Sequence, residues 1–454
     1  MASHVTSADI PANGERLQNA TASKIKLISG VVSAALTLVS LFLLFGPNKA
    51  WAASFSYSWL FALFFFFTLA VGGCFWTLLH NVSNSGWGTS VRRVFENLGA
   101  VYPFLFVFAL PLACPSVQTW LYEWMNIHRG LTGSTFGSAK EALHHSPDPH
   151  HHLLYVKHWY MNIPFWYGRF IFFGVALSLV ILGLRKLSVA QDSDPNPGTS
   201  RLFRARFHST YTLIIFALTI TFAGFDWLKG LDYTWFSTMW GVYLFAGSAL
   251  NSMAVIIITV TLLKRAGYLK HVVSPEHFHI KGKLLFAFTV FWAYIAFSQF
   301  FLIWYANITE ETKYYLIRNT EGWNIASIAL VFGHFVIPFV ILLQAWLKKN
   351  PVMLSIMAAY TLVMHVLDHY LISIPERSVS IYAMAKFGTP EQKAALGHLA
   401  DVVTTTVPGA FWGDILAFAA IGSGFLFFYL RNLGSNNLYP NRDPRILESA
   451  NVSN

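Results

Sequence analysis

Ten long apolar runs, separated by shorter polar segments, set the hydrophobic pattern of this chain. Each run provides about the 20 apolar residues that one helix needs to cross a bilayer. The pattern therefore predicts an all-α, polytopic integral membrane protein, with a membrane domain over residues 24–431 between polar tails at 1–23 and 432–454. The expected helices lie at 25–45, 57–79, 98–120, 165–187, 208–228, 236–263, 284–306, 324–347, 352–374 and 410–431.

Composition supports the membrane assignment and excludes some cofactors. Of the 454 residues, 55% are hydrophobic and only 11% are charged, whereas soluble domains carry about 25% charged residues. The two cysteines, Cys74 and Cys114, lie within apolar runs, and neither CxxC nor CxxCH occurs. We therefore expect the chain to hold no iron–sulfur cluster and no c-type haem of its own.

The basic residues are distributed unequally between the two sides that ten helices define. Of the 31 lysines and arginines, twenty lie on the side that carries both termini, ten lie on the opposite side, and Arg169 lies within a helix. The positive-inside rule then places both termini in the cytoplasm. The longest outer loops, 121–164 and 375–409, are large enough to contact partner proteins.

Ionisable residues inside the bilayer are costly, so each is a functional candidate. His365 and His369 flank Asp368 at the i, i+3 and i+4 positions of one expected helix, so the three share a face. Most candidates lie toward the outer side, where histidines and carboxylates could accept and release protons. The candidates for proton transfer are His365, Asp368, His369, His334, Arg169, Asp226, Asp232, Glu310 and Glu311.

Three stretches carry a resemblance to a known family. They are FDWLKGLDYTWFSTMWGVYLFAGS (225–248), FWAYIAFSQFFLIWYANITEET (291–312) and VFGHFVIPFVILLQ (331–344). They resemble signatures of the membrane subunits of alternative complex III, a bacterial quinol:cytochrome c oxidoreductase, within the NrfD/polysulfide-reductase membrane-subunit family. The likeness is closest to the F-type class, also called quinone-binding subunit 2. Thr309 departs from the family pattern, which commonly has proline there.

The resemblance implies an architecture and a set of partners. It implies two four-helix bundles, over about 57–228 and 236–374, with the first and last helices flanking them. It implies that electrons pass from quinol, usually menaquinol, through partner iron–sulfur and multihaem cytochrome c subunits to cytochrome c or a terminal oxidase. This chain would then sit in the bacterial cytoplasmic membrane and supply scaffold, quinone contact and a proton route. It would have no activity alone, and a paralogous membrane subunit is an alternative holder of the working quinol site.

Structural explanations stand beside the functional ones for each candidate. His365, Asp368 and His369 could form an ion-paired structural cluster between the bundles, and His334 could hydrogen-bond a neighbouring carbonyl. Arg169 could extend its side chain to the interface. Asp226 and Asp232 lie at the expected water boundary, and Glu310 and Glu311 could cap a loop or meet a partner.

Other ligands and other functions are also open. His334 and His365 could ligate a b-type haem between two helices, and the loop HHSPDPHHH (144–152) could bind metal, although we expect no metal site in this chain. A secondary transporter or ion channel would also use buried charges, but its site commonly lies at the midplane beside broken helices. Here the charges lean outward and the runs at 284–306 and 324–347 read as unbroken helices, which disfavours transport. A purely structural anchor is the remaining alternative.

Overall fold

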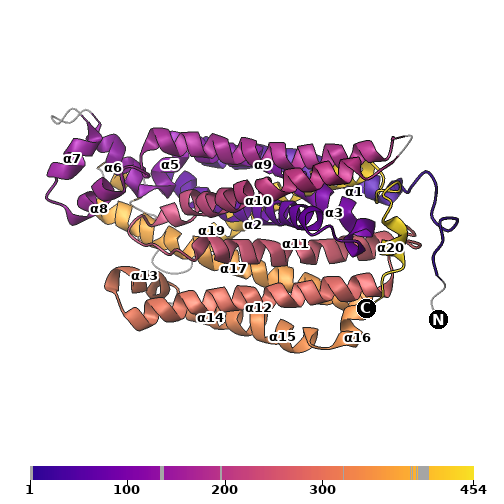
Figure 1. Cartoon of the computed structure of the whole chain (residues 1–454). Coiled ribbons are helices and arrows are strands. Elements are labelled where there is room, and N and C mark those ends of the chain that lie inside the picture. The colour runs from indigo at the N-terminus through magenta and orange to yellow at the C-terminus, as the bar shows by residue number, and fades with distance from the viewer. Residues whose placement is uncertain are drawn as a thin grey trace.

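A computed structural model describes residues 4–132, 138–194, 197–320, 322–388, 390, 392–394, 396 and 408–453. Within these residues the chain is helical, has no β-strand, and contains ten helices that are long and apolar enough to cross a membrane. The predicted all-α, multi-pass architecture is therefore confirmed. The helices run roughly parallel to one long axis, and both termini lie at the same end of the bundle (Figure 1). We call this the terminal end and the opposite end the distal end.

The ten spans are built from the following helices. The first five are α1 (Ala20–Phe45), α2 (Lys49–Val82), the series η1 (Trp87–Val91), α3 (Arg92–Gly99), α4 (Tyr102–Ala109) and η2 (Leu110–Ala113), then α9 (Ile163–Gln191) and α10 (Ser200–Trp227). The second five are α11 (Trp240–Arg265), α12 (Pro275–Ala306), the series α14 (Trp323–Leu330), η4 (Val331–Val336) and α15 (Ile337–Leu342), then α17 (Pro351–Phe387) and α19 (Pro408–Ser435).

Short helices join these spans at both ends. At the distal end, α5 (Pro115–Leu121), α6 (Glu123–Leu131), α7 (Ala139–His145) and α8 (Pro149–Lys157) follow the third span, and η3 (Lys229–Leu231) and α13 (Thr309–Ile317) follow α10 and α12. At the terminal end lie α16 (Ala345–Lys349) and α20 (Ile446–Ala450). The distal segment α5–α8 is the largest elaboration outside the spans.

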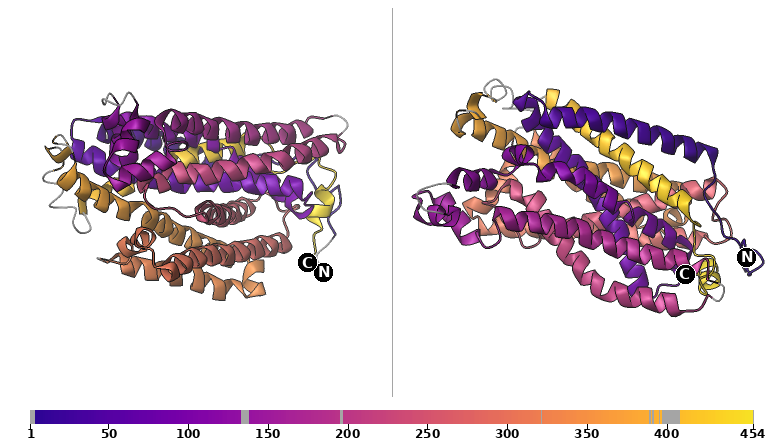
Figure 2. Two further views of the ribbon diagram at one scale, coloured as in Figure 1. Left: turned by 60° about the vertical axis from the view of Figure 1, so that its left-hand side comes forward. Right: turned by 90° about the horizontal axis from the view of Figure 1, so that it is seen from above.

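Helix α2 occupies the centre of the bundle. Its side chains are apolar on every face, including the run Phe64–Phe67, and nearly all of them are buried. It packs against α3, α10, α11, α17 and α19, so it touches both halves of the chain. Helix α1, by contrast, lies beside α19 (Figure 2) and exposes Leu27, Leu38 and Phe42 on its other face. Such exposed apolar side chains suit contact with lipid.

The third span lies about ten residues earlier than expected. The sequence predicted a helix over 98–120, whereas the span covers Trp87–Ala113, begins and ends with a 3₁₀ turn, and passes from α3 to α4 at residues 100–101. Pro103, Pro111 and Pro115 each begin a new helical segment near its N-terminus, where a missing N–H costs nothing. The early start is possible because Arg92 and Arg93 are buried in α3, where both pair with Glu96.

The eighth span is continuous from Trp323 to Leu342, so the helix predicted over 324–347 is present, but it ends earlier than expected and contains a π turn. Between α14 and α15 the backbone adopts a π-helical turn, in which the Ile337 N–H donates to the Phe332 carbonyl. Pro338 explains the change, because it has no N–H to offer the carbonyl of His334 four residues earlier. A π turn inside a helix often marks a functional position, and here it carries His334.

Helix α17 extends well past the expected end at residue 374 and runs on to Phe387, with Pro375 inside it. Pro375 cannot donate to the Leu371 carbonyl, as a helix interior requires. The Arg318 guanidinium replaces that donor, and it gives 2.8 Å hydrogen bonds to the carbonyls of Leu371 and Ile372. Arg318 also pairs with Glu376 over 3.0 Å. The buried Arg318, at the C-terminal end of α13, therefore stabilises the part of α17 around Pro375.

Candidate functional site

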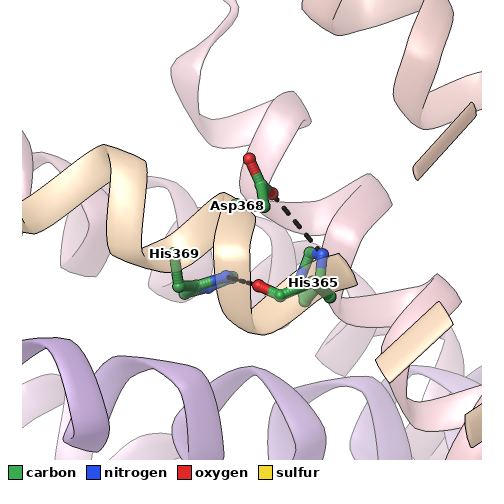
Figure 3. Close-up of side chains that lie close together, drawn as sticks. All are labelled: His365, Asp368 and His369. Atoms are coloured by element: carbon green, nitrogen blue, oxygen red, sulfur yellow. Dashed lines mark hydrogen bonds and ion pairs between the residues drawn. The ribbon is translucent and has the colours of Figure 1, made fainter. Parts of the chain in front are cut away.

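The cluster of three side chains predicted on one helix face is present. His365, Asp368 and His369 project from α17, and all three are buried. His365 Nδ1 lies 3.5 Å from Asp368 Oδ2, and His369 Nδ1 lies 3.2 Å from the His365 carbonyl oxygen (Figure 3). His334, on the π turn, completes the cluster, because its Nε2 lies 3.2 Å from His365 Nδ1. The eighth span thus brings a side chain from a second helix to the three residues of α17.

Two aromatic side chains that the sequence analysis missed hold the Asp368 carboxylate. The Tyr243 hydroxyl of α11 donates to Oδ1. The Trp292 indole N–H of α12 donates to Oδ2 over 3.3 Å, and its ring packs against the His334 ring with centroids 4.0 Å apart. Asp368 therefore receives bonds from two helices besides its own. Hydrogen bonds of this kind make a buried carboxyl group tolerable in an apolar interior.

The histidines keep free ring nitrogens. Among the described residues, His334 Nδ1, His365 Nε2 and His369 Nε2 are buried and have no hydrogen-bond partner. A neutral imidazole has one donor and one acceptor nitrogen, so each of these atoms can give or take a proton. The cluster is thus a chain of exchangeable sites rather than a closed network.

The same side chains bear on metal and haem binding. One ligand atom from each of His365, Asp368 and His369 lies within 4.8 Å of the others, so these residues could hold a metal ion. That arrangement was not anticipated, since the sequence analysis expected no metal site. A haem between His334 and His365 does not fit, because the two imidazoles bond each other directly and leave no gap for a porphyrin.

A cavity of about 670 Å³ opens beside the cluster. Its walls come from α11, α12, α13, the eighth span and α17, and Asp368 is one of the lining residues. The remaining lining is largely apolar and aromatic, with Trp240, Phe300 and Phe335 among the contributors. The volume and the few polar groups are typical of a site for a small organic ligand.

Polar groups at the distal part of this cavity come from α12 and from α13 with its C-terminal end. Gln299 of α12 accepts from Ser237 over 2.9 Å and donates to the Tyr315 hydroxyl over 3.1 Å. Arg318 also lines the cavity. The pKa of Tyr315, which lies outside the spans, is raised to about 12 by burial. Its hydroxyl therefore stays protonated at neutral pH and can donate to a ligand.

Arg169 and Asp226 lie apart from this cluster and form a second polar centre. The Arg169 guanidinium of α9 binds both carboxylate oxygens of Asp226 on α10, over 2.7 and 2.9 Å, and the Tyr160 hydroxyl donates to Asp226 over 2.9 Å. Arg169 is 8% exposed and Asp226 5%. Asp226 is therefore buried and paired rather than solvated.

The last three candidates lie at the distal surface. Asp232 bonds Thr234 and pairs with Lys313 over 3.0 Å. Burial would raise the pKa of Asp232, but the Lys313 charge and the Thr234 bonds outweigh it and hold that pKa below its usual value. Glu310 is exposed and Glu311 half-buried at the start of α13. None of these three carboxylates is among the described residues that line the cavity.

Comparison with family models and with curated proteins finds no match to this chain. The candidate site therefore has to be interpreted from its own chemistry.

Proposed function

We propose that this chain is a membrane subunit of a quinol:cytochrome c oxidoreductase of the alternative complex III type, and that the cavity beside Asp368 binds the quinol headgroup. The observation that carries the proposal is a largely apolar, aromatic cavity with a buried carboxyl group in its wall and histidines behind it. The resemblance of residues 291–312 and 331–344 to that family supports it, because both stretches line this region.

The chemistry of quinol oxidation suits these residues. A quinol that loses two electrons also loses two protons. Asp368 accepts the first proton from a headgroup hydroxyl, and His365, whose Nδ1 lies 3.5 Å from the carboxylate and 3.2 Å from His334, passes that proton on to His334. Asp368 is then ionised again and accepts the second proton of the quinol. In this proposal the electrons leave to a partner iron–sulfur subunit and then to multihaem cytochrome c. The substrate is menaquinol or a related quinol.

The test is turnover measured per assembled complex. Asp368→Asn keeps the size of the side chain but removes proton acceptance, so quinol:cytochrome c turnover should fall about 100-fold, the lower range for a lost general base. Glu310→Gln, an exposed carboxylate outside the cavity, is the matched control and should turn over normally. Normal turnover by assembled Asp368→Asn complexes would refute the proposal. A loss of assembly with normal turnover in the survivors would assign Asp368 a structural role.

The proposal includes the surroundings of the chain. We place it in a bacterial cytoplasmic membrane with both termini in the cytoplasm, which puts the distal end and the cavity toward the outer side. Reporter fusions at the C-terminus and within 144–152 should report cytoplasmic and outer positions. Purification in mild detergent through a tag on this chain should bring down haem c and iron–sulfur subunits, and recovery as a clean monomer would contradict the proposal.

One observation favours transport as a second candidate. The eighth span is locally irregular, with a π turn that carries His334 beside the cavity, and secondary transporters commonly bind their substrates at interrupted helices. Purified chain in proteoliposomes distinguishes the two functions. Ion or solute flux that Asp368→Asn abolishes, without any copurifying redox subunit, would favour the transporter.

A further inference from the structure

A second cavity, of about 380 Å³, lies at the distal ends of α9 and α10. Its walls combine apolar side chains, among them Met161, Phe222 and Phe225, with three cationic ones, Lys157, Arg169 and Lys229. Neither Asp368 nor any of the three histidines beside it is among the described residues that line this cavity. The combination of an apolar pocket with several cations calls for a ligand that is both apolar in part and anionic.

The charges inside this cavity do not balance. Arg169 is neutralised by its two bonds to Asp226. Lys157 donates to the Tyr233 carbonyl over 2.8 Å, and Lys229 donates to the Trp235 carbonyl. Among the described residues, neither lysine forms an ion pair with a carboxylate, and the nearby Asp232 is paired with Lys313. An ammonium group has three donors, so each lysine keeps two for a ligand.

The ionisation of Lys157 agrees with this count. Burial lowers the pKa of Lys157, and the nearby charge of Asp232 only partly opposes that effect. A half-buried ammonium without a direct counter-ion is costly. An anion bound between the two lysines would remove that cost.

The position of the cavity identifies the source of the anion. It opens where α9 begins and α10 ends, and its rim carries the exposed aromatic side chains Trp159 and Phe236. Tryptophan and tyrosine are enriched at the level of lipid headgroups. Below the rim, α9 exposes Ile171 and Phe172 and α10 exposes Leu218. These faces can pack against acyl chains whose headgroup enters the cavity.

We propose that this cavity binds the phosphate of an anionic phospholipid of the distal leaflet, with Lys157 and Lys229 as the headgroup ligands. Basic pockets between membrane helices bind anionic lipid headgroups by this chemistry. A quinone headgroup carries no charge and would leave both ammonium groups unpaired. The site is independent of the proposed quinol cavity, and it can be tested without any turnover assay.

The experiment is native mass spectrometry of the full chain, purified from membranes with whatever subunits accompany it. After delipidation, it is titrated with phosphatidylglycerol, with phosphatidylcholine of the same acyl chains, or with soluble glycerol phosphate. We expect phosphatidylglycerol to bind, and the double variant Lys157→Gln/Lys229→Gln to bind it about 30-fold more weakly, from about 1 kcal/mol per basic residue. Lys140→Gln, an exposed lysine at the same end, is the matched control and should bind as the parent does.

Each other outcome overturns the proposal. Equal binding of phosphatidylcholine would show that charge is not recognised, and equal affinity for glycerol phosphate would show a free-phosphate site. Displacement of the lipid by a quinone analogue, with the lysine variants unaffected, would assign the cavity to quinone. Should the glutamine variant fail to fold, Lys157→Arg/Lys229→Arg keeps the charge and should retain phosphatidylglycerol. Loss of binding in a folded arginine variant would count against the proposal.

Discussion

The buried pair of Arg169 and Asp226 makes a sharp stability prediction. Arg169→Met leaves Asp226 with only the Tyr160 hydroxyl as partner, and Asp226→Asn leaves the guanidinium buried without a counter-charge. Removing one member of a buried pair typically costs about 3–5 kcal/mol. The two charge-assisted bonds, at about 1.5–3 kcal/mol each, give a similar total. Each single variant should therefore lower the free energy of unfolding by about 3–5 kcal/mol.

The double variant separates a charge effect from lost packing. Arg169→Met/Asp226→Asn contains no buried charge, and the introduced amide oxygen can still accept from Tyr160. Its free energy of unfolding should fall by only about 1–2 kcal/mol, so the two single penalties should fail to add by several kcal/mol. The assay is reversible unfolding in mixed micelles of a mild detergent and sodium dodecyl sulfate. Lys313→Met, which breaks the exposed pair with Asp232, is the control and should cost less than about 1 kcal/mol. Additive penalties, or single variants as mild as the control, would refute the reasoning.

Three further predictions concern stability and pH. Arg318→Met should destabilise the chain by about 3–5 kcal/mol by leaving Glu376 and two carbonyls unpaired, and adding Pro375→Ala should recover part of this in the same assay by restoring one helix N–H. Burial opposes ionisation of Asp443, but the bonds and charges of Arg445 and Arg92 outweigh it and lower the pKa of Asp443. The contribution of Asp443 to stability is therefore present above the ordinary aspartate pKa and is lost as the pH falls through the lowered value. Proteolysis of the C-terminal tail should increase only in acid, whereas the Asp443→Asn variant should be cut at every pH. Burial, assisted by His158, lowers the pKa of His128 to about 4. Because the His128 imidazole binds a proton more readily in the unfolded chain, the free energy of unfolding should decline as the pH falls from about 6.5 to about 4. His128→Leu should flatten that part of the stability profile against pH.

The sequence was sufficient for the helices and for local side-chain geometry. Ten apolar runs predicted ten spans, because length and apolarity alone decide whether a helix can cross a bilayer. The i, i+3, i+4 spacing placed His365, Asp368 and His369 on one face, because helical geometry is local.

The partners of these residues could not be predicted, because they come from distant parts of the chain. Tyr243 and Trp292 reach Asp368 from sequence separations of 125 and 76 residues. Arg169 and Asp226 are 57 residues apart. Helix α2 is mainly apolar on every face, so it has no polar side that would show which neighbours it packs against. Its position at the centre of the bundle could therefore not be predicted either.

Two errors had signals in the sequence that were not used. Pro338 was visible four residues after His334, and it disrupts the hydrogen-bond ladder where the eighth span forms its π turn. Pro375 lies four residues after Leu371, and a helix that continues past such a proline needs another donor, which Arg318 supplies. In both cases the proline changes the backbone at the wall of the cavity, so the proline positions could have pointed to the candidate site.

The most direct test of the central claim is to map where a quinol analogue binds. A photoreactive naphthoquinol analogue is crosslinked to the purified complex, and labelled peptides are identified by mass spectrometry, with and without excess unlabelled quinol. The account predicts protectable labels on the cavity walls, within 290–300 of α12 and 368–372 of α17, and loss of these labels when Ala293, a small lining residue, is replaced by tryptophan in a complex that still assembles. Protectable labels confined to another subunit, or to the second cavity between α9 and α10, would contradict it.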